Sequence, residues 1–107
     1  MAKKHIRVLG GACGTSRFRV AEKVKQMCIE EGWREVKVTQ QDMWESSYIP
    51  NNVDLLIDLV LFPGETKVPI VRARRLVVDI DDPQTTLEIK EALRRIFEDN
   101  SPGKEVG

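Results

Sequence analysis

The sequence lacks any long apolar segment, and it has few cysteines and no net charge. Its 107 residues include 17 basic and 17 acidic side chains, so the formal net charge is zero. General nucleic-acid-binding proteins usually show an excess of basic residues, and we therefore expect no nucleic-acid partner. No apolar run approaches the roughly 18 residues that a membrane-spanning helix needs, so we expect no direct membrane insertion.

The chain has few residues that can act as metal ligands or nucleophiles through sulfur or imidazole. It contains two cysteines, Cys13 and Cys28, and one histidine, His5. The N-terminus has no apolar stretch of the kind found in export signals, which predicts free thiols in a reducing, cytoplasmic environment. His5 precedes the first strand and has no neighbouring metal ligands. We therefore predict no metal site and no cofactor.

The pattern of apolar residues predicts a single domain over residues 1–100 and a flexible tail over residues 101–107. Residues 40–52 follow no regular pattern. Strands are predicted at 5–9, 36–38 and 54–61, with further strand material, in one bent strand or two, at 69–71 and 76–80.

Two helices are predicted between and after these strands. The first runs from Ser16 or Arg17 to Gly32, and the second begins at Pro83 with Asp82 as its cap. Because strands and helices alternate along the chain, the predicted fold is α/β, with a mainly parallel sheet and helices on its faces.

A glycine-rich segment follows the first strand. Its glycines allow a tight turn, and the helix that begins behind it offers unpaired N–H groups and a partial positive charge. Arginines in the first helical turn oppose the helix dipole, unless an anion lies in the loop. The segment therefore predicts a site for a phosphate- or sulfate-sized anion, although it could instead be a tight turn with its arginines in solvent. The predicted phosphate-binding residues are Gly10, Gly11, Ala12, Gly14, Thr15, Ser16 and Arg17.

Cys13 lies inside this loop, where backbone N–H groups and a helix N-terminus favour a nucleophilic thiolate. Cys13 and Arg19 also have the cysteine–arginine spacing of cysteine-dependent phosphatases, but here the cysteine comes four residues after the strand. The alternative is that Cys13 only fills a tight loop. Cys28 falls on the apolar face of the first helix and is predicted to belong to the core.

Charged residues also stand near the ends of the later strands. Asp58 is predicted to cap a strand end or to bind a loop, because the acidic pair of response-regulator receivers is absent after the first strand. A basic cluster, Arg72, Arg74 and Arg75, follows the next apolar segment. It could meet a phosphate or an acidic partner. The favoured interpretation is a solvated turn paired with Asp79, Asp81 or Asp82.

The segment IRVLGGACGTS at 6–16, followed by an amphipathic helix that ends in KQMC, resembles the start of a IIB component of the bacterial phosphotransferase system. The resemblance is closest to the galactitol-specific type, and it continues through VDLLI at 53–57, VPIV at 68–71 and the final helix. It implies a three-layer α/β sandwich with flanking helices and a four-stranded, mainly parallel sheet in the order 2-1-3-4.

The resemblance also implies a phosphoryl relay. A IIA partner transfers a phosphoryl group from a phosphohistidine to a cysteine of the IIB component, which passes it to sugar at a membrane IIC component. In this chain the position of that cysteine is Leu9. Either Cys13 takes over as the catalytic nucleophile, or the domain keeps the fold and the anion site as a binding or regulatory module. The sequence identifies neither the sugar nor the oligomeric state.

Overall fold

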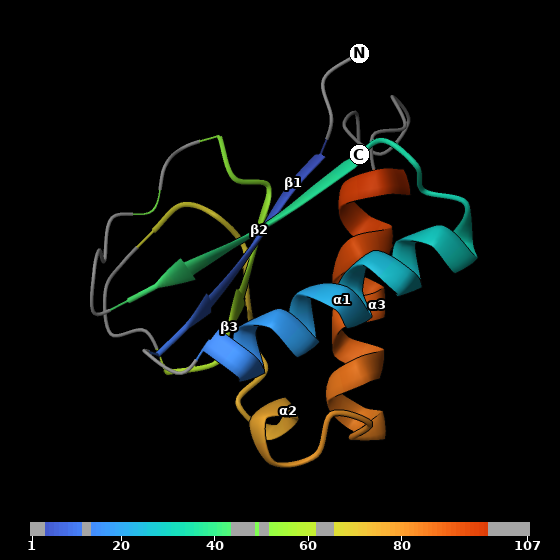
Figure 1. Ribbon diagram of the computed structural model, residues 1–107. Helices are drawn as coiled ribbons and strands as arrows, with labels where there is room; N and C mark the ends of the chain where they lie inside the picture. Colours follow the sequence, from blue (N-terminus) through green and yellow to red (C-terminus); the bar gives the residue numbers. More distant parts are fainter. Residues whose placement is uncertain (1–3, 12–13, 44–48, 50–51, 62–65, 99–107) are drawn as a thin grey trace.

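Four strands form one parallel sheet in the order β2-β1-β3-β4 (Figure 1). The computed structural model describes residues 4–11, 14–43, 49, 52–61 and 66–98. The predicted α/β fold and sheet order are confirmed, whereas the predicted tail lies outside the described residues. The strands are β1 (Lys4–Gly10), β2 (Val36–Asp42), β3 (Leu55–Asp58) and β4 (Ile70–Arg72), and the helices are α1 (Gly14–Glu31), α2 (Arg75–Val78) and α3 (Pro83–Glu98).

The two faces of the sheet are covered differently. Figure 1 shows α1 and α3 packed on one side of the sheet. Ile6 and Val8 of β1 join the core on the helical side. Leu9 of β1 and Leu56 of β3 instead pack against Val53 and Val68, which belong to the connections. Both central strands are therefore buried on two faces, as is usual for a parallel sheet.

The helix α1 is held on the sheet by an apolar stripe and ends where the sequence predicts. Its buried residues recur at helical spacing and are Val20, Ala21, Val24 and Cys28. At its C-terminus Gly32 adopts a positive φ of 81°, and the N–H of Trp33 reaches back to the carbonyl of Cys28 at 2.9 Å. The Trp33 ring then stacks on Phe97 of α3 with centroids 5.0 Å apart.

The N-terminus of α3 confirms the predicted cap. Oδ2 of Asp82 accepts hydrogen bonds from the N–H of Thr85 at 2.9 Å and from its hydroxyl at 2.6 Å. These two bonds lower the pKa of Asp82. Pro83 is the first helical residue, a position where its missing N–H has no intrahelical partner in any case.

Several expectations about element boundaries are wrong. The predicted strand material at 76–80 is not a strand, because β4 ends at Arg72 and the chain turns into α2. Leu76 is buried in α2, but Val77 and Val78 are exposed. The two β-branched valines therefore do not belong to a buried strand. Residues 40–42 of the segment expected to be irregular belong to β2, which extends to Asp42 through its ladder with β1. The strand predicted at 54–61 is shorter, because β3 covers only Leu55–Asp58.

A polar cluster on β1 and β2 surrounds the buried His5. Its Nε2 lies 2.7 Å from Oγ1 of Thr39, and the same oxygen accepts a hydrogen bond from Nε of Arg7 at 3.2 Å. An uncharged imidazole can accept the Thr39 hydroxyl proton, whereas a protonated one cannot. Burial lowers the pKa of His5 below its ordinary value of 6.5, and the charges of Arg7 and Lys37 lower it further.

We therefore predict that the free energy of unfolding decreases as the pH falls below 6.5, the ordinary pKa of His5. The unfolded chain binds a proton there that the folded chain does not, so the slope reaches at most about 1.4 kcal/mol per pH unit. Urea unfolding between neutral and mildly acidic pH measures this slope. His5→Gln should flatten it, and an equal slope in both proteins would contradict this role of His5.

Candidate functional site

The carboxyl ends of β1, β3 and β4 meet at one edge of the sheet. Leu9, the residue before Gly10, pairs with Asp58 at the end of β3, and Asp58 pairs with Arg72 at the end of β4. The glycine-rich segment follows β1 at this edge, where sites in parallel sheets generally form. The structure therefore brings the predicted anion loop close to an acidic and a basic strand end.

The side chain of Arg17 is folded back onto this loop. Its Nε donates a hydrogen bond of 3.1 Å to the carbonyl oxygen of Gly11. A Cβ atom added at Gly10 would lie 2.2 Å from Cγ and 2.8 Å from Cδ of Arg17, and one added at Gly14 would lie 3.4 Å from its Nη2. The guanidinium is thus held beside three glycines, which differs from the alternative of an arginine directed into solvent.

Gly10 is required for space and not for an unusual backbone angle. Among the described glycines, only Gly32 has a positive φ. An alanine at position 10 would therefore suit the backbone, but its methyl group would overlap the stem of Arg17. Because Cγ is close to the helix backbone, this overlap cannot be relieved by moving only the end of the side chain.

The remaining predicted anion ligands lie at the start of α1. The helix begins at Gly14, earlier than the predicted start at Ser16 or Arg17, so Thr15 and Ser16 occupy its first turn. The first four N–H groups of an α-helix lack intrahelical partners, and they provide hydrogen-bond donors at this end. Arg19 is exposed one turn into the helix. Ala12 and Cys13 lie outside the described residues.

Leu9, where the sequence resemblance predicts a cysteine, is the residue before Gly10 at the end of β1. It is fully buried, and it packs with Leu56, Val53 and Val68 on the face of the sheet opposite to the helices. Its side chain therefore belongs to the core, and a hydrocarbon group offers no nucleophile.

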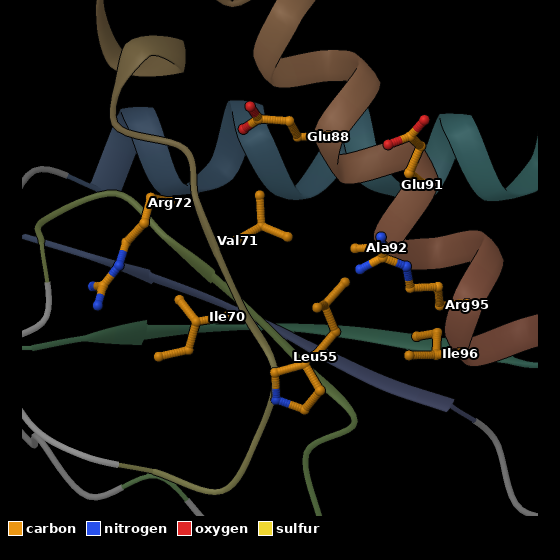
Figure 2. Close-up of a pocket in the computed structure, with 10 residues that line it drawn as sticks. Leu55, Ile70, Val71, Arg72, Glu88, Glu91, Ala92, Arg95 and Ile96 are labelled. Atoms are coloured by element: carbon orange, nitrogen blue, oxygen red, sulfur yellow. The ribbon is translucent and has the colours of Figure 1, made fainter. Parts of the chain in front are cut away.

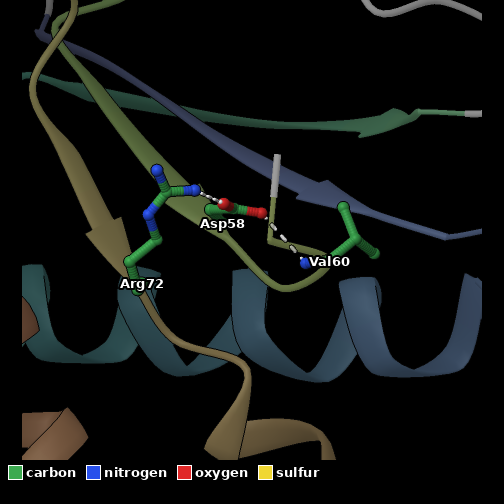
Figure 3. A network of polar contacts seen from close by, with 3 residues as sticks. All are labelled: Asp58, Val60 and Arg72. Carbon is green, nitrogen blue, oxygen red and sulfur yellow. Dashed lines mark hydrogen bonds and ion pairs between the residues drawn. The ribbon is translucent and has the colours of Figure 1, made fainter. Parts of the chain in front are cut away.

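Asp58 and Arg72 form an ion pair across β3 and β4 (Figure 3). The Asp58 side chain is fully buried: Oδ2 accepts a hydrogen bond from Nη1 of Arg72, and Oδ1 accepts one from the N–H of Val60 at 2.9 Å. The predicted role of Asp58 at a strand end is confirmed. The predicted pairing of Arg72 with a later aspartate is wrong, because the parallel register places Arg72 beside Asp58.

The sequence does not reveal this pair. Asp58 and Arg72 are the last residues of β3 and β4, and the parallel register brings these positions together. In the sequence, however, Asp58 stands within an apolar run that continues to Leu61 and so does not mark a strand end. The pair places one guanidinium at the same edge of the sheet as the glycine loop. Its carboxylate is shielded from solvent, while the Arg72 side chain is 52% exposed.

Cys28 is the other thiol of the chain, and it lies on the buried face of α1, in the core. Burial raises its pKa to about 11, which suppresses the thiolate at neutral pH. The prediction that Cys28 is a core residue is therefore confirmed.

Within the described ranges, no group of three or more histidine, cysteine, aspartate or glutamate side chains is arranged to hold a metal ion. No helix in the same ranges is long and apolar enough to cross a membrane. Neither a scan against protein-family models nor a search of curated protein sequences found a match.

The contact between position 10 and Arg17 gives a direct prediction. Gly10→Ala should lower the free energy of unfolding by about 1–3 kcal/mol, because the new methyl group overlaps the Arg17 stem. In an Arg17→Ala background the same substitution should cost less than about 1 kcal/mol, since the obstructing atoms are gone. Urea unfolding of the four proteins measures this coupling. Equal costs in the two backgrounds would contradict the contact.

Proposed function

We propose that this chain is a IIB-type component of a bacterial sugar phosphotransferase system, and that its glycine loop holds the transferred phosphoryl group. The single observation that carries the proposal is the packing of Arg17 against Gly10 and Gly11, at the carboxyl end of β1 and the start of α1. A guanidinium, helical N–H groups and glycine backbone are the donors that a phosphoryl group requires. The parallel sheet in the order β2-β1-β3-β4 agrees with the architecture that the resemblance implies.

The proposed reaction moves a phosphoryl group between two proteins. The N–P bond of a phosphohistidine on a IIA-like donor breaks, and an S–P bond to the Sγ of Cys13 forms after the thiol has released its proton to solvent. The phosphoryl group then passes to sugar at a IIC-like membrane component. The galactitol-type resemblance suggests a polyol or sugar substrate for that component, and the relay places this chain in the cytoplasm.

Cys13 is the proposed acceptor because the two other positions considered are unsuitable. Leu9 has a hydrocarbon side chain in the core. Cys28 is fully buried under α1, and its raised pKa of about 11 keeps it protonated. Cys13 follows the glycines in the sequence and precedes the first helical N–H groups. Its thiolate would be favoured by that positive end of the helix.

The burial of Leu9 favours a second candidate function. In this alternative, the chain has lost phosphoryl transfer and binds phosphate, or a phosphorylated partner, as a regulatory module. Leu9 packs fully buried against Val53, Leu56 and Val68, so its side chain contributes to stability at the position where the family has its nucleophile. Such a substitution removes the transfer step and leaves the donors of the loop in place.

Phosphorylation followed by intact-mass measurement distinguishes the two functions. The chain is incubated with a phosphorylated IIA protein of the galactitol type, and the matched variants are Cys13→Ser and Cys28→Ser. We expect a gain of one phosphoryl group in the wild type and in Cys28→Ser, and none in Cys13→Ser. Because Cys28 is buried, its variant controls for the general loss of a thiol.

Other outcomes identify what is wrong with the proposal. No gain in any protein, with a donor that phosphorylates its own IIB partner, would reject the relay and leave the binding module. A gain that persists in Cys13→Ser would reject Cys13 as the acceptor. Leu9→Cys adds a further comparison, because phosphorylation of this variant alone would indicate a domain that lost transfer through the substitution at position 9.

A further inference from the structure

An open groove lies between the edge strand β4 and the helix α3. Figure 2 shows Ile70 and Val71 of β4 on one side of it, and Glu88, Glu91, Ala92 and Arg95 of α3 on the other. The groove has a volume of about 430 Å³, and Leu55 and Ile96 contribute to its apolar lining. Arg72 also lines the groove, whereas none of the described residues of the glycine loop does.

The side of α3 that borders this groove has an ordered charge pattern. Glu88, Glu91, Ala92 and Arg95 follow the spacing i, i+3, i+4, i+7 and share one helical stripe. The stripe is acidic in its N-terminal half and basic at its C-terminal end, with a small residue near the middle. The side chains of Glu88, Glu91 and Arg95 are exposed, and no ion pair joins them to another residue in the part of the chain that the structure describes.

This stripe is complementary to itself when the helix direction is reversed. Two antiparallel copies of α3, related by a two-fold axis between positions 91 and 92, place Glu88 of each copy opposite Arg95 of the other. Glu91 then lies opposite Ala92, whose small side chain permits close approach of the helices. A two-fold axis repeats each contact, so the arrangement forms two identical ion pairs.

We infer that this groove is the contact surface for a second copy of this chain, with α3 packed antiparallel to α3 across a two-fold axis. The edges of the two β4 strands then face each other, and the apolar lining of each groove is withdrawn from water. An added peptide strand is a less suitable occupant, because β4 has only three residues and follows Pro69, which has no N–H.

The inference is tested by sedimentation velocity over a concentration series up to about 200 μM, a range that populates weak dimers. We expect the wild-type mass to rise from 12.2 kDa toward twice that value. Arg95→Glu should raise the dissociation constant at least about tenfold, because it places two carboxylates opposite each other at two symmetric positions. The double variant Glu88→Arg/Arg95→Glu should return the constant to within about threefold of the wild type, because it reverses both partners of each pair.

Arg94→Glu is the matched control. It makes the same charge change on the same helix, at an exposed position beside the stripe, and should leave the dissociation constant unchanged. Circular dichroism melting verifies that each variant is folded. A wild type that stays monomeric throughout the series would overturn the inference. So would a dimer that Arg95→Glu does not weaken, or one that the double variant fails to restore.

Discussion

The Arg17 side chain occupies the space that a side chain at position 10 would need, and the candidate site depends on this constraint. The arginine lies in the first turn of α1, where its charge opposes the helix dipole, yet its side chain folds toward the loop and bonds the Gly11 carbonyl. A missing methyl group at Gly10 makes this conformation possible. The result is that the Arg17 guanidinium lies at the carboxyl end of β1, beside the start of α1.

The rest of the sheet holds this edge in place. β1 and β3 are buried from both sides, by α1 and α3 on one face and by the apolar residues of the connections on the other. Asp58 ties the end of β3 to the end of β4 through Arg72, and its second oxygen fixes the turn at Val60. Asp58 is fully buried whereas Arg72 is half exposed, so removing Arg72 would take the charged partner away from a buried carboxylate.

The sequence predicted the fold well because its signals are local. The apolar spacing in α1, the stop at Gly32 and the cap at Asp82 each act within a few residues, and the structure confirms all three. The valines at 77 and 78 misled the prediction of strands, because β-branched residues favour strands only where neighbours cover them. The partner of Arg72 could not be read from nearby residues, since it depends on the register of two strands.

The site was predicted only in part. The position of the loop follows from alternating strands and helices, and the structure brings Gly10, Gly11 and Arg17 together there. The conformation of Arg17 was not predictable, because a sequence gives no side-chain torsion angles. Position 9 remains the central difficulty: its leucine is a sound core residue and an unsuitable nucleophile. The proposed phosphoryl transfer would therefore need Cys13 as its acceptor.

The most direct measurement of the anion site is a titration of the protein with inorganic phosphate, followed by backbone amide resonances. We expect saturable shifts confined to Gly11 and to the first turn of α1, and a weaker response in Arg17→Gln, which keeps a polar side chain but loses the charge. No shift at millimolar phosphate, or equal shifts at the far end of α3, would contradict an anion site in this loop.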